Sequence, residues 1–230
     1  TYSDNLHLAV SLRSFRAEKL SSFVHSLLSF NYDAAESYCE ISEKGYPIVL
    51  TRDMDKAREW LRNKARGSQQ TGVLVTKVAA RFKPLAVNIL AQGDQNAVHW
   101  FLEDKTDIRS SNYLEDAATE IQVQGLELDF ACVLWDADVR YANGTWKYYK
   151  FNGKNKWNPV SDTKNGIEEK KYMLNAYRVL LTRARQGIVI CVPKGNNRST
   201  PEGFPEDPTR LPEYYNGTYE YLKSLGIKEI

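Results

Sequence analysis

Short, continuous runs of apolar and β-branched residues constrain the fold of this chain more than any other feature. Four of them are Pro47–Thr51, Gly72–Thr76, Phe130–Trp135 and Ile188–Val192. They lack the regular alternation of polar and apolar residues that a half-exposed strand shows, and strands buried on both faces are typical of a parallel sheet covered by helices. Helical patterns stand between these runs. We therefore predict a three-layer α/β fold with a mainly parallel sheet.

The other elements follow from the spacing of apolar residues. Positions 20, 23, 24, 27 and 28 are apolar and fall on one face of a helix. Further helices are predicted over Asp53–Arg66, around Ala79–Ala91, over Met173–Arg185 and near Tyr214–Leu225. Further strands are predicted at Val98–Leu102 and Thr119–Val123.

The segment 140–164 interrupts this pattern. It holds six Lys and Arg residues against a single Asp, and it contains the turn signals Asn143-Gly144 and Asn152-Gly153. We predict a β-hairpin insertion at 140–164. Its interleaved aromatic side chains fit two roles, stacking on nucleic-acid bases or packing across strands, and we favour packing.

Composition narrows the class of protein. The chain has 31 Lys and Arg against 29 Asp and Glu, a net charge of +2, which excludes a basic nucleic-acid coat protein. The longest apolar run is far shorter than the roughly 20 residues of a membrane span, and no signal peptide opens the chain. The cysteines (Cys39, Cys132, Cys191) are widely spaced. They favour a reducing compartment over a disulfide framework or a zinc site. We expect a cytoplasmic protein without a membrane partner.

Several familiar catalytic signatures are missing from the sequence. It has no GxxxxGK[ST] phosphate loop, no GxGxxG, no HExxH and no GxSxG. The sequence thus lacks the usual signatures of three activities: ATP hydrolysis by this chain alone, dinucleotide binding and serine-type hydrolysis. The chain also begins with Thr rather than Met, so we expect it to be part of a longer protein.

Three segments carry a more specific signal. They are Leu8–Ser14, Thr119–Asp129 and Asn175–Arg185. Together and in this order they resemble motifs IV, V and VI of superfamily 1 helicases. The wording QGLELD, followed by NAYRVLLTRARQG, is similar to that of the Schlafen group 3-like DNA/RNA helicase domains, and this resemblance extends from about Leu6 to the C-terminus.

The resemblance implies that residues 1–230 form the second, C-terminal RecA-like domain of a superfamily 1-type helicase or translocase. ATP and Mg²⁺ would be bound mainly by an N-terminal RecA-like domain that carries the Walker A phosphate loop and is absent from this chain. That domain and DNA or RNA are the expected partners. The 230-residue chain alone is not expected to hydrolyse ATP, because it lacks the phosphate cradle.

The resemblance also implies residue roles. A guanidinium can clamp phosphate oxygens in two places and neutralise charge in the transition state. By resemblance, two such arginines, Arg13 and Arg183, would contact the γ-phosphate. The nucleotide would be bound by Gln124, Gly125 and Glu127. The nucleic-acid backbone would be contacted by Thr119 and Gln122. The sequence departs from the family pattern at Ser11-Leu12, where an Asn-Tyr pair is usual, and at Ile121, where a His is usual.

Each of these residues also has a purely structural interpretation. Arg183 and Arg185 in a last helical turn, with Gly187 beyond it, would match an ordinary C-cap. Arg13 would be a solvated residue before a cap, Gln124-Gly125 a plain turn, and Glu127 a surface charge.

Two other functions stay open. One is a non-catalytic nucleic-acid-binding module with a degenerate helicase fold. The other is a metal-dependent nuclease or modifying enzyme using Asp136 and Asp138 at a strand end.

Overall fold

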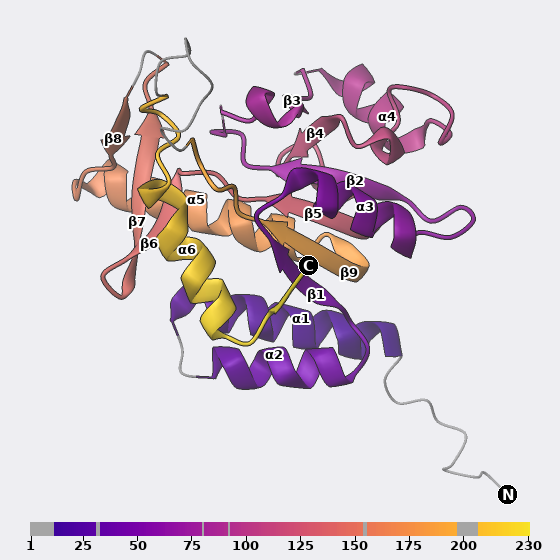
Figure 1. Ribbon diagram of the computed structural model, residues 1–230, viewed down its shortest axis with the longest axis horizontal. Coiled ribbons are helices and arrows are strands. Elements are labelled where there is room, and N and C mark those ends of the chain that lie inside the picture. Colours follow the sequence, from indigo (N-terminus) through magenta and orange to yellow (C-terminus); the bar gives the residue numbers. More distant parts are fainter. Residues whose placement is uncertain (1–11, 31–32, 80, 92, 154–155, 197–206) are drawn as a thin grey trace, which may run out of the picture.

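A seven-stranded sheet forms the centre of the molecule (Figure 1). The computed structural model describes residues 12–30, 33–79, 81–91, 93–153, 156–196 and 207–230. The strand order is β10-β1-β9-β5-β2-β4-β3, and every neighbouring pair is parallel. The strands are β1 (Ile48–Thr51), β2 (Thr71–Val75), β3 (Asn88–Ile89), β4 (Asp116–Thr119), β5 (Leu128–Leu134), β9 (Ala184–Cys191) and β10 (Lys228–Glu229).

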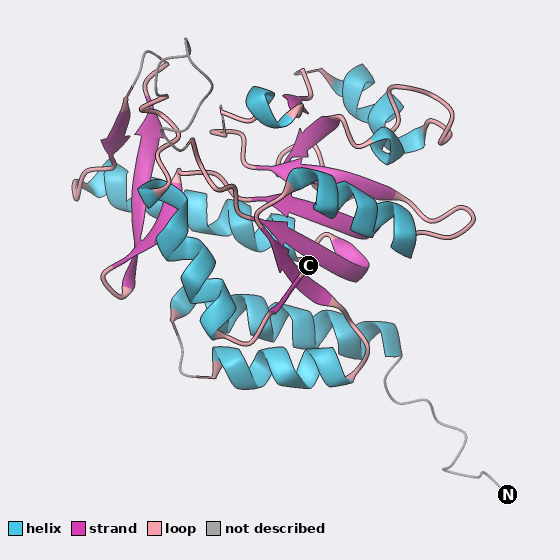
Figure 2. Cartoon of the chain, in the orientation of Figure 1, coloured by secondary structure: helices cyan, strands magenta, loops and turns pink. Residues whose placement is uncertain are grey.

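Helices cover both faces of this sheet (Figure 2). On one face, α1, α2, α5 and α6 contribute side chains to a single hydrophobic cluster, and α3 packs on the opposite face through Met54, Ala57 and Leu61. The helices are α1 (Leu12–Ser29), α2 (Ala34–Glu43), α3 (Met54–Lys64), α4 (Asp94–Leu102), α5 (Lys164–Leu181) and α6 (Glu213–Ser224). The predicted α/β, RecA-like three-layer fold is thus confirmed.

The strands are buried for the reason that the sequence indicated. All seven residues of β5 are buried, because β9 and β2 flank the strand and helices lie above and below it. Ala131 of β5 lies opposite Ile188 on one side and Gly72 on the other. A strand that is covered on both faces does not need to alternate polar and apolar residues.

A small antiparallel sheet follows β5 and confirms the predicted hairpin insertion. It consists of β6 (Val139–Ala142), β7 (Thr145–Phe151) and β8 (Trp157–Pro159). Trp146 stacks on Trp135, and Trp135 stacks on Tyr177 of α5 with ring centroids 4.0 Å apart. The aromatic residues of the insertion that are buried therefore extend the hydrophobic core.

Two predicted elements are wrong. Val98–Leu102 lies in α4 and is not a strand. The described residues of the segment around Ala79–Ala91 hold only a 3-10 turn (Lys83–Leu85) and the two-residue β3. Pro84 lies inside that turn and lacks a backbone N–H, so an α-helix cannot continue through it. Among the side chains of residues 95–102 in α4, only Trp100 is deeply buried. It packs so closely on Gly72 that a Cβ atom there would lie 2.7 Å from the indole ring.

Two predicted boundaries also change. The predicted strand at Thr119–Val123 ends at Thr119, and the predicted helix over Met173–Arg185 ends at Leu181. The chain passes from α5 into β9 at Ala184, because Ala184 pairs with Leu128 at the start of β5. Pairing within the central sheet therefore outweighs the helical periodicity of the last four residues.

Among the described helices, none is both long enough and apolar enough to cross a membrane.

Candidate functional site

An open cavity of about 630 Å³ lies at the amino-terminal end of the central strands. Three parts of the chain that are distant in sequence form its wall: α1 through Ala17 and Leu20, the entry to β5 through Glu127, and the 182–186 segment that enters β9. Segments of the second and third helicase-like motifs thus meet in one place, next to the helix that follows the first.

Arg183 stands at the junction of α5 and β9. Its Nε donates to the Val179 carbonyl at 3.2 Å, and Nη1 donates to the Leu126 carbonyl at 3.3 Å. Its own carbonyl accepts from the Leu128 amide at 3.0 Å. Within the described part of the chain no residue accepts a hydrogen bond from Nη2. The half-buried guanidinium therefore joins the ends of two motifs and keeps donors for a further acceptor.

The capping interpretation of this region holds only in part. The Arg183 bond to Val179 does satisfy a carbonyl in the last turn of α5, where partial negative charge accumulates. Arg185 and Gly187, by contrast, belong to β9 and lie beyond the helix end. The structure thus corrects the alternative in which both residues terminate the helix.

Asp129 holds the segments around the cavity together through hydrogen bonds. Its Oδ1 accepts from Arg185 Nη2 at 3.0 Å and from Gln186 Nε2 at 2.7 Å, and its Oδ2 accepts from the Gln70 amide at 2.9 Å. The carboxylate is buried and connects the starts of β2, β5 and β9. We call this arrangement the Asp129 clamp.

Glu127 lies two residues before Asp129 and lines the cavity. Its side chain is 53% exposed, and its Oε2 is 3.9 Å from Arg185 Nε. Gln124 and Gly125 lie in the exposed turn that leads to it. Gly125 has a φ of +83°, a left-handed conformation that favours glycine.

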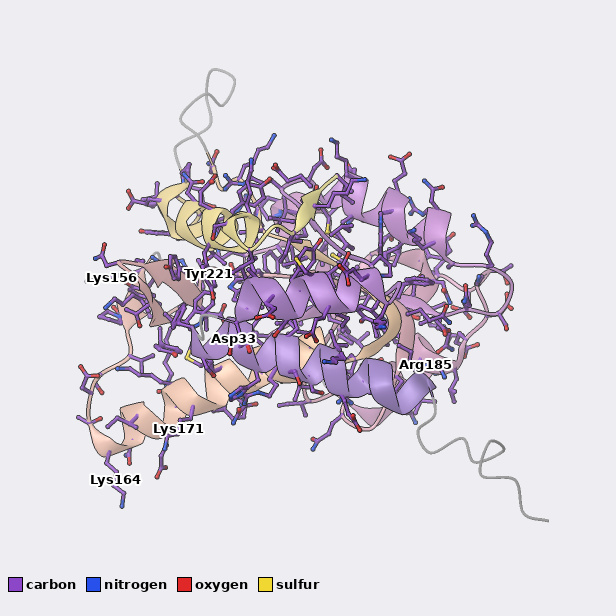
Figure 3. All side chains as sticks on the ribbon, turned by 90° about the horizontal axis from the view of Figure 1, so that it is seen from below. Asp33, Lys156, Lys164, Lys171, Arg185 and Tyr221 are labelled. Atoms are coloured by element: carbon purple, nitrogen blue, oxygen red, sulfur yellow. The ribbon has the colours of Figure 1, made fainter. Side chains whose placement is uncertain are left out.

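Most of the first motif, Leu8–Ser14, lies outside the residues that the structure describes. Residues 8–11 are not described, and Arg13 lies in the first turn of α1 with no described side chain. Its backbone position is four residues before Ala17 and seven before Leu20, so all three lie on one helical face. Figure 3 shows Arg185 beside the amino-terminal end of this helix.

Thr119 and Gln122 are not brought into the cavity. Thr119 ends β4 at the carboxyl edge of the sheet, and both its amide and its hydroxyl donate to Gln122 Oε1 at 2.9 and 3.0 Å. Gln122 Nε2 in turn donates to the carbonyls of Leu90 and Ala91. The two side chains therefore have protein partners here, and their contact with nucleic acid stays a prediction.

Residues missed by sequence reasoning complete the cavity. Tyr46 is 1% exposed and donates its hydroxyl to the Ala184 carbonyl at 2.8 Å. Burial raises the pKa of Tyr46, so this hydroxyl stays protonated. Gln186 accepts from Gln69 Nε2 at 2.8 Å. No local motif marks these residues, because their partners come from other strands.

The acidic pair that follows β5, Asp136 and Asp138, is hydrogen-bonded to buried hydroxyl groups. Asp138 accepts from the Tyr177 hydroxyl at 2.6 Å and the Thr76 hydroxyl at 2.9 Å, so both oxygens are occupied. Asp136 accepts from the Tyr215 hydroxyl at 3.2 Å. Burial, and secondly the neighbouring Asp136, raises the pKa of Asp138 to about 7. Across the described ranges, no group of three or more His, Cys, Asp or Glu side chains could hold a metal ion.

Comparison with known families supplies the last observation. Residues 1–194 match the family described as Schlafen group 3, DNA/RNA helicase domain. No curated protein and no solved structure matches the chain. The match covers all three motif segments and every residue that lines the cavity. The chain therefore belongs to the Schlafen group 3 DNA/RNA helicase domain family.

Proposed function

We propose that this chain is the C-terminal motor half of an ATP-dependent DNA or RNA helicase or translocase. In this proposal, ATP and Mg²⁺ are held mainly by a second RecA-like domain with a phosphate loop. The present domain closes over the triphosphate and supplies arginines and part of the grip on nucleic acid.

One observation carries the proposal. The cavity at the amino-terminal end of the sheet brings Glu127 and Arg183 next to Leu20 of α1, although more than a hundred residues separate Leu20 from Glu127. Chance packing of surface segments gives no reason for residues of the second and third helicase-like motifs to share a cavity next to α1. A nucleotide bound between two domains does.

The chemistry of the cavity fits the anionic end of a nucleotide. Arg183 is anchored through two of its nitrogens, so its fork has a fixed direction, and Nη2 is the donor left for a phosphate oxygen. Arg13 would add a second cation from α1. The exposed carboxylate of Glu127 suits a ribose hydroxyl, and Gln124 and Gly125 lie on the same turn. No metal site is required of this chain.

The test uses a protein that joins this chain to an amino-terminal phosphate-loop domain and measures nucleic-acid-stimulated ATP hydrolysis. Arg183→Ala is expected to lower kcat by about 10³-fold, the lower end of the range for a transition-state arginine, with a much smaller change in KM. Arg183→Lys keeps the charge and loses the fork, so it should recover little.

A matched control separates chemistry from folding. Arg62→Ala removes an exposed arginine from α3, on the opposite face of the sheet, and should leave kcat within about twofold. ATP hydrolysis that is unaffected by Arg183→Ala would contradict the proposal. Nucleic-acid binding without any ATP hydrolysis would favour the alternative, a non-catalytic binding module.

A further inference from the structure

A second cavity, of about 360 Å³, lies at the opposite, carboxyl-terminal end of the strands. Residues that directly follow β1 (Arg52, Asp53) and β9 (Pro193, Lys194) line it, together with Arg210. It shares no lining residue with the first cavity. No described residue of the motif segments lines it, so the motor role does not account for it.

The topology makes this a favourable position for a ligand. The chain leaves β1 for α3 on one face of the sheet, and it leaves β9 for α6 on the other face. β1 and β9 are neighbours, so their two connections diverge and open a crevice between the carboxyl ends of the strands. In open parallel sheets, such a switch point is where ligands bind.

The carboxylates of this cavity are already engaged. Asp53 caps α3 by accepting from the amides of Asp55 and Lys56, at 2.9 and 3.3 Å. Asp55 pairs with Arg58 at 2.9 Å. Their negative charge is therefore offset locally, whereas three other cations of the lining form no ion pair with a carboxylate of the described residues.

Those cations are Arg52, Lys194 and Arg210. Arg52 donates from Nη2 to the Pro193 carbonyl at 2.9 Å and lies over the Tyr219 ring, 4.7 Å from its centroid. These contacts hold the guanidinium in place but leave its Nε buried without a hydrogen-bond partner. Burial lowers the pKa of Arg52. The ordinary pKa of a guanidinium is so high that the group still keeps its charge.

Arg210 strengthens the case. Only 8% of the residue is exposed, and among the residues that the structure describes none accepts a hydrogen bond from its guanidinium. Its backbone is tied to the same rim, because its carbonyl accepts from the Asn196 amide at 2.5 Å. Arginine keeps its charge, so both guanidinium groups offer donors to an anion, and the Nε of Arg52 is a buried donor that no protein group satisfies.

We propose that this cavity binds the phosphate group of a phosphate monoester. Arg52, Arg210 and Lys194 would hold the phosphate oxygens, since planar guanidinium forks match them in pairs and the ammonium adds charge. Met54, Leu85 and Ala86 give one wall an apolar surface for the organic part of the ligand. The volume accepts a small phosphate ester or the phosphorylated end of a nucleic-acid strand.

The experiment titrates inorganic phosphate and a nucleoside 5′-monophosphate into the 230-residue chain. Calorimetry gives the affinity, and amide NMR signals of residues 52–55 and 193–195 report the location. Arg52→Gln and Arg210→Gln should each weaken binding at least tenfold. Arg62→Gln, on the outer side of the same helix that follows Arg52, should change it less than twofold.

Folding is monitored in parallel by thermal unfolding. Arg210→Gln removes a guanidinium that has no acceptor among the described residues, so its Tm should stay close to that of the unsubstituted protein while phosphate no longer raises it. Lys194→Gln is a safe second variant because Lys194 is exposed, and it should weaken binding about threefold.

Two results would overturn the proposal. One is no binding of either compound at roughly 1 mM. The other is binding that survives Arg52→Gln and Arg210→Gln but is lost in Arg183→Gln, which would place the ligand in the first cavity. Oligonucleotides with and without a 5′-phosphate identify the source. Tighter binding of the phosphorylated strand than of the monophosphate indicates a strand end, and equal binding indicates a small ester.

Discussion

Replacing Asp129 by Ala should destabilise the fold by about 3 kcal/mol, because one buried carboxylate joins three strands of the central sheet. Hydrogen bonds to a charged group contribute roughly 1.5–3 kcal/mol each. The Arg185 side chain is 41% exposed, so solvent can replace much of its share. The Gln70 amide and the Gln186 side chain, both partly buried, lose an acceptor and account for most of the loss.

For a domain of this size, 3 kcal/mol corresponds to a fall in Tm of about 6–12 °C. Urea unfolding followed by tryptophan fluorescence measures the free energy of unfolding directly. Asp129→Asn should cost less, since it keeps one acceptor oxygen and the side-chain volume. Glu127→Ala, two residues away and exposed, should change stability by less than about 0.5 kcal/mol.

The reasoning fails if Asp129→Ala costs less than about 1 kcal/mol. It also fails if Arg185→Ala costs as much as Asp129→Ala, because the clamp then rests on the ion pair and not on the buried donors. A double-mutant cycle between the two positions separates these cases.

Two further predictions concern the core. The raised pKa of Asp138, about 7, means that the folded state keeps a proton between roughly pH 4 and 7 where the unfolded chain loses it. The stability that this residue contributes is therefore complete below about pH 4 and is lost as the pH rises to 7. Asp138→Asn should flatten this part of a stability–pH curve measured by urea unfolding, and an unchanged slope would contradict the assignment. Gly72→Ala should destabilise the protein by about 1–3 kcal/mol, since the added Cβ meets the Trp100 ring at 2.7 Å; a Tm equal to that of the unsubstituted protein would show that Trp100 can move aside.

The central sheet was predictable because its strands carry the signal themselves. Continuous apolar runs need no information from distant residues to be recognised, and four of them became β1, β2, β5 and β9. The same criterion failed at Val98–Leu102. Five apolar or aromatic positions suit either element, and the helix is chosen because it places Trp100 against Gly72 while Val98 and Leu102 stay exposed.

The candidate site was predictable only in part. Resemblance located Glu127 and Arg183, and the structure places both at one cavity. It could not reveal the Asp129 clamp, whose partners lie on β2 and β9, or the end of α5 at Leu181. Both depend on which strands become neighbours, and strand order is not written in the local spacing of residues. The second cavity lies beyond every motif for the same reason.

The position of β1 has a consequence for how the protein is made. Both strands that flank it arrive late: Val49 aligns with Val189 of β9 and with Lys228 of β10. While the ribosome is still translating the middle of the chain, the edges of β1 have no partner, and β2 cannot serve because β9 and β5 separate the two strands. Pairing between strands so distant in sequence slows folding, and meanwhile β1 exposes unpaired edges that can aggregate. Synthesis of this domain should therefore depend on chaperones until its last forty residues have emerged.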